Sequence, residues 1–585
     1  MKLLLTTLNA KYIHSSLALA YLQAVAADGS WETRVREFTI NEKNEYIMAE
    51  IFREQPDVLA FSVYIWNVGA ILEICREYKK VAPQSYIILG GPEVSYNALT
   101  VLEENESIDC IIRGEGEESL KEVLESIAGT KSRAAIKGIS YRNGPSILDN
   151  PDRELIADLA IIPFPYQDQL DSYHKRILYY ETSRGCPYNC SYCLSSTIKG
   201  VRFFPLQRVK EDLAKLIHAG VEEVKFVDRT FNADERRARE IMEFIISQQG
   251  NTRFHCEITA EYLSPEFISF LATVPADLFK FEIGIQSTCP ESLAAVRRNS
   301  NWTRLRTNIE RLQAAANIHL HLDLIAGLPY ESFKRFGRSF NDVFSLHPDA
   351  IQLGFLKLLK GSQIRAAARE HGYLFQDNPP YQLLANHYLD YNDILQLKQI
   401  ENLLDRYYNS GKMRFTLDFI VQQIYQGDAF NFLAAFASYW QEQGYFACSH
   451  RQEAEYNFLL DFIKSNFVEF QETVNELLKY DYLWNQQSSN LPSQLNRYNP
   501  ENTSQILYTL IKDRDFVQSN LPPYASRKSN RELRRLLHLE FFKTDLITGI
   551  RSSQLVPYLF LYNPRRKKAE ELIKVPGTFI NSDIN

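Results

Sequence analysis

The stretch ETSRGCPYNCSYC, from Glu181 to Cys193, places three of the chain's eight cysteines within eight positions, as Cys186, Cys190 and Cys193. So tight a spacing does not fit scattered buried thiols in a chain this poor in cysteine. The residues just before it, ILYYETS, predict a strand, so the cysteines follow the carboxyl end of a strand. We interpret the trio as the chemical centre around which the rest of the chain is organised.

Three thiolates at this spacing indicate a metal centre with one open coordination position. A structural zinc site takes four protein ligands, commonly in Cys-x2-Cys pairs, and no fourth cysteine or well-placed histidine lies nearby in the sequence. Iron–sulfur clusters also normally take four thiolates. A trio without a fourth member therefore predicts an iron–sulfur cubane in which one iron stays free for a small-molecule ligand.

The trio, with Tyr192 directly before its last cysteine, resembles the signature of the radical S-adenosylmethionine (SAM) superfamily. The resemblance implies that Cys186, Cys190 and Cys193 hold a [4Fe-4S] cluster whose open iron binds SAM. Reductive cleavage of SAM would give methionine and a 5′-deoxyadenosyl radical, which abstracts a hydrogen atom from the substrate. The resemblance also implies an electron donor such as flavodoxin or ferredoxin.

Residues 176–360 predict a parallel barrel that begins at the cysteine stretch. Six strand-like runs alternate with helical patterns: ILYYETS, VEEVKFVD, TRFHCEI, DLFKFEIGI, HLHLDLIAG and AIQLGFLK. Strands that alternate with helices form parallel β/α units, and the chemistry of such barrels lies at the carboxyl ends of the strands. We expect a partial (β/α)6 barrel.

Polar and glycine residues follow these strands where the family binds SAM. By the resemblance, Asp228 and Asn232 in VKFVDRTFN contact the methionine moiety, and Gly327 in HLDLIAGLPYE lies against the adenine. A simpler interpretation of Asn232 is that it caps the following helix. Three further polar residues are better explained by ligand contact than by packing, and they alternate with apolar neighbours so that two of them can face the barrel interior: Glu257, Glu282 and Gln286.

Residues 1–130 predict a doubly wound α/β domain. Five apolar runs alternate with helical patterns: KLLLTTLN, TRVREFTI, DVLAFSVYIW, SYIILGG and IDCIIRG. Strands that are apolar throughout fit a parallel sheet covered on both faces, which binds its ligand at the strand carboxyl ends. No G-x-G-x-x-G follows the first strand, and this disfavours a nicotinamide or flavin dinucleotide.

Two pairs of glycines lie directly after predicted strands. Gly90 and Gly91 open the turn GGPEVS, and Gly114 and Gly116 lie in RGEGEE, where missing side chains let a ligand approach the backbone. Tight strand-to-helix turns explain these glycines equally well. Tyr64, at the end of the third strand, is expected to form part of an apolar wall of the same site.

The two turns resemble those of the cobalamin-binding domain that precedes many radical SAM barrels. The resemblance implies a Rossmann-like fold with cobalamin across the strand ends and its corrin ring facing the barrel. The chain lacks the Asp-x-His-x-x-Gly motif that supplies a lower histidine ligand in better-known B12 proteins. His14, in NAKYIHSS, does not fit that motif, so we expect cobalamin to bind without a protein histidine beneath it.

The remaining regions predict connecting and helical structure. Residues 131–175 indicate a structural linker with a short hairpin at IKGISYRNG. Residues 361–585 change to amphipathic patterns such as NDILQLKQIENLLDRYY and SNRELRRLLHLEFF, which predict a mostly α-helical domain, and PRRKKAEELIK predicts a solvated helix face. This region resembles an uncharacterised domain attached to some B12-binding radical SAM proteins.

Composition excludes several classes of protein. The 585 residues are 45% apolar and 23% charged, which is ordinary for a soluble chain of several domains. A net charge of −7 disfavours a general nucleic-acid binder. The sequence has no apolar run long enough for a membrane span, and its start lacks a signal-peptide pattern. We therefore expect a cytoplasmic protein.

Together these features predict a cobalamin-dependent radical SAM enzyme, and the most frequent chemistry of that class is methylation of an unactivated carbon in a small molecule or peptide. Ring formation or rearrangement without methyl transfer stays open. A non-catalytic cobalamin or iron–sulfur sensor is a further alternative, although strand-end motifs for a cleavable ligand argue against it. A methylthiotransferase would need a second cluster, which Cys75 and Cys110 alone cannot supply.

Overall fold

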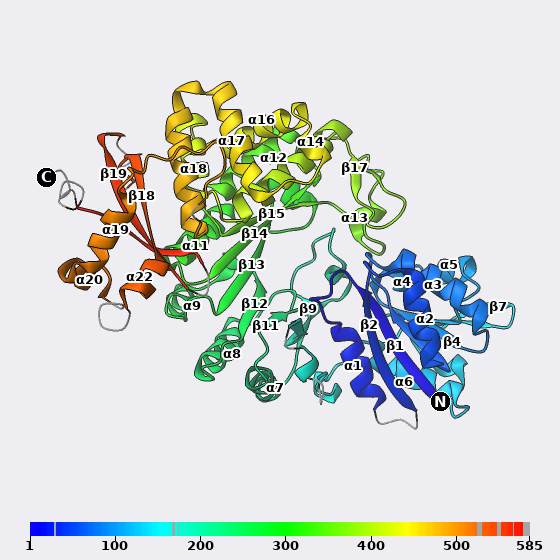
Figure 1. Cartoon of the computed structure of the whole chain (residues 1–585). Helices are drawn as coiled ribbons and strands as arrows, with labels where there is room; N and C mark the ends of the chain where they lie inside the picture. The colour runs from blue at the N-terminus through cyan, green and yellow to red at the C-terminus, as the bar shows by residue number, and fades with distance from the viewer. Residues whose placement is uncertain are drawn as a thin grey trace. The chain divides into compact units, whose positions relative to one another are not determined.

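The computed structural model describes residues 1–27, 31–166, 170–173, 175–488, 490–522, 529–546, 551–564, 567–576 and 579. The chain forms two compact units, Met1–Ile394 and Leu395–Asn585. Both α/β regions expected from the sequence lie in the first unit (Figure 1). Within the described residues, every helix is too short or too polar to cross a bilayer.

The first α/β region is a seven-stranded sheet in the order β2-β1-β3-β4-β5-β6-β7. Strands β1 to β5 pair in parallel, and the β6-β7 hairpin is added antiparallel beside β5. The doubly wound fold is confirmed. The strands are β1 (Lys2–Asn9), β2 (Glu32–Thr39), β3 (Val58–Ser62), β4 (Tyr86–Gly90), β5 (Cys110–Ile112), β6 (Ile139–Asn143) and β7 (Ser146–Asp149). The helices are α1 (Leu17–Ala26), α2 (Asn44–Glu54), α3 (Val68–Val81), α4 (Pro92–Ser95), α5 (Ala98–Glu104) and α6 (Gly116–Ile127).

Alternate residues of these strands bury both faces of the sheet. Leu4 and Phe61 belong to the core beneath α2, α3 and α5, whereas Leu3 and Ile88 belong to the core beneath α1 and α6. Each of the four side chains is buried. Because helices cover both faces, a ligand reaches this sheet only at the strand ends.

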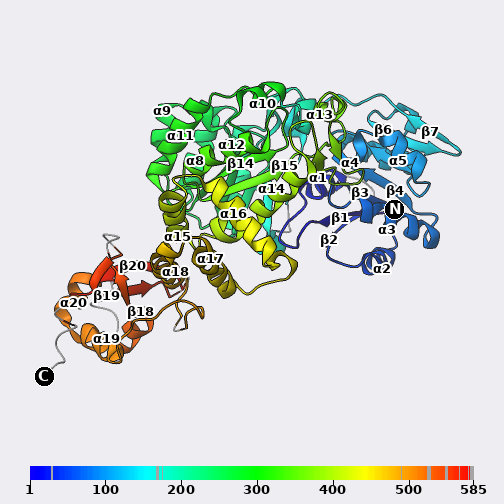
Figure 2. The same ribbon diagram turned by 90° about the horizontal axis from the view of Figure 1, so that it is seen from above.

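The second α/β region is a six-stranded sheet in the order β15-β14-β13-β12-β11-β8. Figure 2 shows β14 and β15 of this sheet. All neighbouring strands are parallel and follow one another in chain order, which confirms the partial barrel. The strands are β8 (Ile177–Tyr180), β11 (Glu223–Phe226), β12 (Arg253–Ile258), β13 (Phe279–Gln286), β14 (His319–Ala326) and β15 (Ala350–Phe355). The helices are α7 (Leu206–His218), α8 (Glu235–Ser247), α9 (Pro265–Leu271), α10 (Pro290–Ala295), α11 (Trp302–Ala315) and α12 (Phe333–Phe344).

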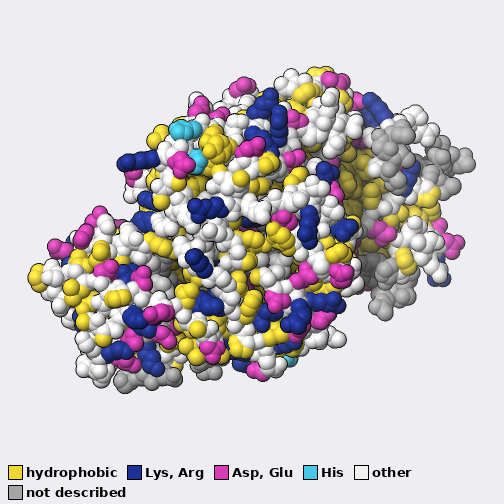
Figure 3. All heavy atoms as spheres, turned by 180° about the vertical axis from the view of Figure 1, so that it is seen from behind, with side chains coloured by type: hydrophobic (Ala, Val, Ile, Leu, Met, Phe, Trp, Pro, Cys, Tyr) yellow, Lys and Arg dark blue, Asp and Glu magenta, His cyan; other side chains and the backbone are white. Residues whose placement is uncertain are grey.

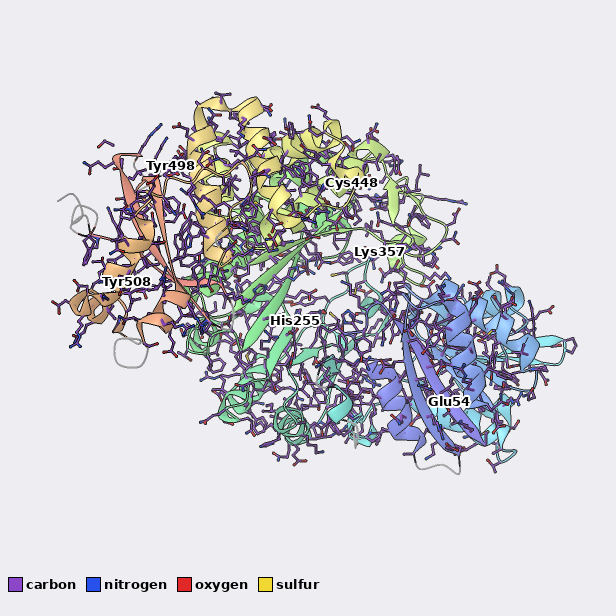
Figure 4. All side chains as sticks on the ribbon, viewed as in Figure 1. Glu54, His255, Lys357, Cys448, Tyr498 and Tyr508 are labelled. Atoms are coloured by element: carbon purple, nitrogen blue, oxygen red, sulfur yellow. The ribbon has the colours of Figure 1, made fainter. Side chains whose placement is uncertain are left out.

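The two faces of the barrel sheet differ in polarity. On β13, buried residues such as Phe281 alternate with half-buried ones such as Glu282, and β14 repeats the alternation with His321 and Asp323 on the half-buried face. His255, labelled in Figure 4, belongs to the same face on β12. Helices such as α12 pack against the sheet and cover its apolar face, so the polar face lines the interior of the barrel.

Shorter elements complete the first unit. The antiparallel hairpin of β9 (Ser183–Cys186) and β10 (Gly200–Phe203) follows β8 and carries the cysteine stretch. After β15 come α13 (Gln363–Ala366) and the antiparallel pair β16 (Leu374–Phe375) and β17 (Leu383–Ala385). Helix α14 (Tyr391–Leu403) crosses from the first unit into the second.

The second unit is mostly helical, as predicted, and also contains the antiparallel sheet β18-β19-β20. Tyr407 and Trp440 are fully buried, so these aromatic residues form core. The helices are α15 (Arg414–Phe419), α16 (Ala429–Glu442), α17 (Gln452–Asn466), α18 (Gln471–Asn485), α19 (Thr503–Lys512), α20 (Arg514–Asn520) and α22 (Asn530–Leu536), with π-helical turns at Leu404–Asn409 and Ile420–Ile424. The strands are β18 (Leu537–Thr544), β19 (Arg551–Tyr562) and β20 (Ala569–Lys574).

Two helix predictions in this region are wrong. The run SNRELRRLLHLEFF begins as α22 but continues from Leu537 as β18, and AEELIK forms β20 instead of a solvated helix face. Leu539 and Phe541 enter the core at a period of two, and β19 pairs with both β18 and β20. Pairing with β19 therefore overrides the local helical pattern. Arg565 and Arg566 of the second run lie outside the described residues.

Surface charge is mixed. In the view of Figure 3, Lys and Arg side chains are interspersed with Asp and Glu side chains over the visible face. This agrees with the small net charge of −7 on 585 residues.

Candidate active site

The cysteine stretch lies on a hairpin whose geometry requires glycine. Gly185 has φ +99°, and a Cβ there would lie 2.1 Å from the carbonyl oxygen of Gly200 on β10. Strand β9 therefore runs close against β10 and ends at Cys186. Cys190 and Cys193 lie in the loop that follows, where the N–H of Cys193 donates to the carbonyl oxygen of Cys190 at 3.1 Å. One short loop thus presents all three predicted ligands.

The three thiols share one local environment. Cys186 Sγ lies 3.8 Å from Thr230 Oγ1, and Arg298 Nη1 donates to Cys190 Sγ at 3.8 Å. Burial raises the pKa of the Cys186 thiol, and the charges of Cys193 and Cys190 raise it further, while hydrogen bonds partly oppose both effects. The sulfur atoms are therefore within electrostatic reach of one another.

Three thiolates on one loop are a donor set that fits a cubane cluster, in which each thiolate binds its own iron atom. Within the described ranges, no three His, Cys, Asp or Glu side chains converge on one metal position. Cys75 lies in one apolar core of the first sheet and Cys110 in the other. Burial raises the pKa of both thiols.

Arg298 connects the cysteine loop to the barrel strands. Its guanidinium donates to Tyr192 Oη at 3.4 Å, to Cys190 Sγ and to the carbonyl oxygen of Gly284 on β13. Burial raises the pKa of Tyr192, so its hydroxyl stays neutral. Tyr192, predicted to be a cofactor contact, therefore lies beside a predicted cluster ligand. Sequence analysis missed Arg298, because no motif marks its position.

Asp228, predicted to contact the methionine moiety, supports the cysteine hairpin. Its buried carboxylate accepts from the Thr182 N–H at 2.8 Å, from Thr182 Oγ1 at 2.6 Å and from Ser183 Oγ at 2.5 Å. Burial raises the pKa of Asp228, and these hydrogen bonds act in the opposite direction. In the structure, Asp228 therefore joins the start of the hairpin to the end of β11 by hydrogen bonds. Its contact with the methionine moiety stays a prediction.

Asn232 links two strand-end loops of the barrel. Its amide donates to the carbonyl oxygen of Thr259 and accepts from the Thr259 N–H, both at 2.9 Å. Helix α8 is capped instead by Asp234, whose carboxylate accepts from the Arg237 N–H at 3.0 Å. The helix-cap interpretation of Asn232 is therefore wrong, and its contact with SAM stays a prediction.

The interior face of the barrel carries a charged set on β11, β12 and β13. Glu282 Oε2 accepts from Lys225 Nζ at 2.9 Å and lies 3.0 Å from His255 Nε2. Burial alone would raise the pKa of Glu282, but the two basic partners outweigh it and lower the pKa to about 2. Glu257 lies 4.0 Å from Lys225, and burial followed by repulsion from Glu282 raises its pKa. Both glutamates lie on the interior face.

Asp323, on β14, lies on the same face with a weaker partner. Its buried Oδ1 makes no hydrogen bond, and the nearest basic atom is His321 Nε2 at 3.6 Å. Burial raises the pKa of Asp323 to about 8, and repulsion from Glu282 and Glu257 adds to the effect. Sequence analysis did not select Asp323 or His321, although their alternation with leucines in HLHLDL was a readable signal.

Gln286 ends β13 in a backbone conformation that residues with side chains rarely adopt, with φ +71°. Its side chain folds back over Gly284, where a Cβ would lie 2.2 Å from Gln286 Nε2. The sheet register also shifts between these two residues. Such strain at a strand end is common at functional sites. The ligand contact of Gln286 stays a prediction.

Gly327, at the end of β14, also requires glycine. It has φ +100°, and a Cβ there would lie 2.1 Å from Leu383 Cδ2 on β17. Its carbonyl oxygen accepts from Tyr373 Oη at 3.1 Å and from Asn386 Nδ2 at 3.0 Å. The segment around β16 and β17 therefore packs directly on this strand end. The adenine contact stays a prediction, and it must use other atoms than this carbonyl.

Tyr64 and Trp66 form an aromatic surface at the strand ends of the first sheet. Their rings stack with centroids 4.6 Å apart and planes 5° from parallel, and Trp66 Nε1 donates to the Leu8 carbonyl oxygen at 3.1 Å. Burial raises the pKa of Tyr64, while a hydrogen bond with Ser62 and the charge of Arg229 lower it. Since Arg229 follows β11, this surface lies within electrostatic reach of the barrel.

The four turn glycines differ in what they permit. Gly91 has φ +113° and lies where a Cβ would be 2.4 Å from the Val63 carbonyl oxygen, and Gly114 has φ +77°. Backbone geometry alone therefore requires glycine at both. At Gly90 and Gly116 a Cβ would meet only ordinary contacts, the nearest at 3.7 and 3.6 Å. The tight-turn explanation accounts for Gly91 and Gly114 but not for Gly90 and Gly116, and the ligand contact of all four stays a prediction.

His14 lies in the loop after β1 and contacts the barrel. Its Nδ1 is 2.8 Å from the Tyr179 hydroxyl on β8. Burial lowers the pKa of His14, and the positive charge of Lys11 adds to this. Helix α1 is capped by Ser16, so His14 is a loop residue that joins the two domains.

Comparison with known families matches three stretches of the chain. Residues 3–124 match the B12 binding domain, residues 180–343 match the Radical SAM superfamily, and residues 369–557 match DUF4080, described as a protein of unknown function. The chain therefore combines a B12-binding domain with a radical SAM domain. The predicted domain types, and the cofactor classes that define them, are confirmed. Its C-terminal part belongs with the DUF4080 sequences.

Three relatives illustrate the range of similar proteins. The cobalamin-dependent radical SAM methyltransferase TokK of Streptomyces tokunonensis is 27% identical over 305 residues, which cover 49% of this chain and 44% of TokK. The hopanoid C-3 methylase of Methylococcus capsulatus is 26% identical, with 49% and 56% covered. The anaerobic magnesium-protoporphyrin IX monomethyl ester cyclase of Cereibacter sphaeroides is 23% identical, with 52% of each chain covered. The chain thus spans about half the length of these relatives.

Solved structures show the same fold. OxsB, a cobalamin-dependent SAM radical enzyme with aqua-cobalamin bound, aligns with a TM-score of 0.59 at 15% identity, covering 82% of this chain and 79% of OxsB. The methyltransferase TsrM of Kitasatospora setae, with cobalamin and a [4Fe-4S] cluster bound, aligns with a TM-score of 0.54 at 18% identity, covering 65% and 78%. At these identities the likeness concerns the fold alone.

Proposed function

We propose that the protein is a cobalamin-dependent radical SAM enzyme that methylates an unactivated carbon of a small molecule or peptide. The observation that carries the proposal is the union, in one compact unit, of a three-cysteine hairpin and a B12-binding domain. Arg184 of the hairpin donates to Glu117 in a strand-end turn of that domain at 2.5 Å. Two cofactors bound at these places would face a common site.

The residues of the two domains have different proposed roles. Cys186, Cys190 and Cys193 would hold a [4Fe-4S] cluster, which together with SAM would supply radical chemistry, and cobalamin would supply the methyl group. Arg298 lies beside Cys190 and would place a positive charge next to this sulfur ligand of the cluster. Such a neighbour adjusts the electronic properties of a metal site. Glu257 and other polar residues of the barrel interior orient SAM and substrate.

The strand-end turns of the first sheet bind cobalamin. Gly90 and Gly116 offer backbone that a ligand can approach, and Tyr64 with Trp66 offers an aromatic surface beside it. We assign residues 1–130 to the cobalamin domain, 131–175 to the linker, 176–360 to the radical SAM barrel and 361–585 to the DUF4080 region. The enzyme works in the cytoplasm with an electron donor such as flavodoxin or ferredoxin.

A second candidate is a cobalamin-dependent radical SAM enzyme that closes or rearranges a ring without methyl transfer. The similarity to the magnesium-protoporphyrin IX monomethyl ester cyclase, over 318 residues, favours it. Both candidates share SAM cleavage. They differ in whether S-adenosylhomocysteine is released.

The deciding experiment is anaerobic reconstitution with iron, sulfide and hydroxocobalamin, followed by SAM and a reductant. We expect about four irons per chain, a cobalamin spectrum that survives gel filtration, and release of 5′-deoxyadenosine and S-adenosylhomocysteine. Release of 5′-deoxyadenosine alone would favour the ring-forming enzyme. A loaded cluster that cleaves no SAM would favour the sensor.

A further inference from the structure

The turn after β5 directs two carboxylates toward the radical SAM domain. Glu117 Oε1 accepts from Arg184 Nη2 at 2.5 Å, and Glu115 Oε1 accepts from Arg202 Nη2 at 2.7 Å. Arg184 and Arg202 are paired in the register of the hairpin that leads to Cys186. The four charged side chains are only 10–18% exposed. The domain contact is therefore ionic and largely desolvated.

Arg184 forms ion pairs with residues of both domains. Besides Glu117 and Glu115, it pairs with Glu181, whose Oε1 lies 2.8 Å away at the start of the cysteine stretch. Burial raises the pKa of Glu181 to about 7. Burial also opposes the charged form of Glu115, but Arg202, the Ile156 N–H and Arg184 outweigh it and lower its pKa. A planar guanidinium presents five N–H donors in a rigid fork, whereas a lysine presents three from a single nitrogen atom on a flexible stem.

The end of β4 repeats the arrangement against the segment that follows the last barrel strand. Glu93 is 5% exposed, accepts a hydrogen bond from Tyr381 Oη and lies 3.1 Å from Lys360 Nζ. Beside it, the Tyr96 ring packs on Gly361 so closely that a Cβ there would lie 2.3 Å from the ring. Lys360 and Tyr381 follow the last barrel strand, β15.

Both strand ends therefore combine glycines with glutamates at or just before the start of the next helix. Those after β5 reach the cysteine hairpin, and Glu93 reaches the segment after β15. Gly91 precedes Glu93, and Gly114 and Gly116 alternate with Glu115 and Glu117. Buried ion pairs seldom stabilise a protein more than apolar contacts of the same size, because desolvation offsets their attraction. Their hydrogen bonds are directional, however, and fix geometry. Two domains that only packed against each other would not need such directional hydrogen bonds.

We propose that Glu93 and the pair Glu115 and Glu117 form a two-point clamp that sets the separation between cobalamin and the cluster. This inference rests on the proposed function. The loop after β1 also joins the domains, through the contact of His14 with Tyr179. The glutamate contacts at the ends of β4 and β5 add two directional contacts beside the turns proposed to hold cobalamin, and so fix the position of those turns. Small displacements of reacting groups cost large factors in rate. The clamp residues are positioning residues, since none of them has to touch a reacting atom.

Three single variants test the clamp. Arg184→Lys keeps the charge but replaces the two guanidinium nitrogens that pair with Glu115, Glu117 and Glu181 by a single ammonium nitrogen. Glu93→Gln keeps an acceptor for Tyr381 but loses the ion pair with Lys360. Both are conservative, so the chain should fold. The matched control is Glu154→Gln, which removes a solvent-exposed pair with Lys137 of similar length, 2.7 Å.

The first measurement needs no cofactor. Amide hydrogen exchange of the full chain, purified without cofactors, should rise in residues 112–118 for Arg184→Lys and in residues 90–95 for Glu93→Gln, with the other turn unchanged in each. Glu154→Gln should change neither turn. A uniform rise over the whole first unit would indicate lost stability instead of a released contact and would overturn the proposal. Wild-type exchange in both variants would overturn it as well.

The second measurement uses protein loaded with iron, sulfide and hydroxocobalamin. Pulsed electron paramagnetic resonance between Co(II) and the reduced cluster should give a narrow distance distribution in the wild type and in Glu154→Gln, and a broader one in the two clamp variants. Single-turnover release of S-adenosylhomocysteine should fall roughly tenfold or more, at unchanged iron and cobalamin content. If the wild type takes up neither cofactor, the proposed function fails. If it takes up both and the clamp variants keep the wild-type distance, only the clamp fails.

Discussion

The two parallel sheets of the first unit hold ligands in opposite ways. In the sheet of β1 to β5, apolar side chains fill both faces, and only the strand-end turns are left for binding. In the barrel sheet one face is apolar, and the other carries Lys225, Glu257, Glu282 and Asp323. The first sheet therefore offers backbone and shape to a ligand, whereas the second offers side chains and charge.

This contrast predicts that the two sheets respond differently to substitution. A substitution on a central strand of the first sheet should alter stability, because most residues of β1, β3, β4 and β5 are core on one face or the other. A substitution on the interior face of the barrel alters the charges that meet a ligand and leaves the apolar face intact. Variants in the two sheets should accordingly separate folding from chemistry.

Removal of the thiols should give the largest effect. Alanine at Cys186, Cys190 and Cys193 together should abolish iron and sulfide uptake in anaerobic reconstitution, because no other side chain in the hairpin replaces a thiolate. Iron analysis and visible absorbance measure the loss. Cys448→Ala removes an exposed cysteine of the second unit and should keep full iron content. A cluster that persists in the triple variant would contradict the assignment of these ligands.

Truncation of a core residue in the first sheet should give the next largest effect. Leu59 is fully buried on β3, so Leu59→Ala should lower the free energy of unfolding by about 2–5 kcal/mol. Gln352→Ala, at an exposed position on the polar face of β15, should change it by less than about 0.5 kcal/mol. Urea unfolding measures both. Equal costs would remove the distinction between the two sheets.

Substitutions of the turn glycines should have smaller effects, on stability at Gly91 and on cobalamin binding at Gly90. Gly91→Ala forces φ +113° and a clash with Val63, and should cost about 1–3 kcal/mol of stability. Gly90→Ala meets only ordinary contacts, so it should fold normally and weaken cobalamin binding. Thermal unfolding and equilibrium dialysis with hydroxocobalamin separate the two. Unchanged cobalamin affinity in Gly90→Ala would show that the ligand does not approach the backbone there.

Asp323 should give an effect that depends on pH. Its pKa of about 8 in the folded chain lies above its ordinary value of 3.8. Its contribution to stability is therefore complete below about pH 4 and is lost as the pH rises through about 8. Asp323→Asn should remove this loss, so the melting temperature of the variant relative to wild type should rise between about pH 5 and pH 9. A constant difference would show that Asp323 ionises normally.

Glu282 provides the control of opposite sign. Its pKa of about 2 lies below its ordinary value of 4.5, so Glu282 stabilises the fold above about pH 4.5 and loses that effect as the pH falls toward 2. Glu282→Gln should therefore be destabilised at neutral pH and approach wild type in acid. Melting curves across the same buffers report both variants.

The fold was readable from the sequence where the signal was local. All six barrel strands and the five parallel strands of the first sheet were predicted, because each is an apolar run bounded by turn residues. Strands β18 and β20 were missed, because their pairing with β19 lies outside any local window. The helical pattern of AEELIK carried no sign of that partner.

The site was readable to a lesser degree. The spacing of Cys186, Cys190 and Cys193 indicated their chemistry directly. Arg298 carried no signal, because its contact with Cys190 joins residues 108 positions apart. The sequence also could not show that the carboxylate of Asp228 accepts hydrogen bonds from Thr182 and Ser183, because these bonds depend on how the hairpin folds back.

The order of the first sheet has a consequence for handling the protein. Its outer strands among the described residues are β2 and β7. Strand β2 carries Arg34 and Arg36, which pair with Glu50 and Glu54 of α2, and β7 spans only Ser146–Asp149. A strand from another molecule would have to displace these ion pairs or dock on a very short edge. The apoprotein should therefore resist aggregation, so that cofactors can be added after purification.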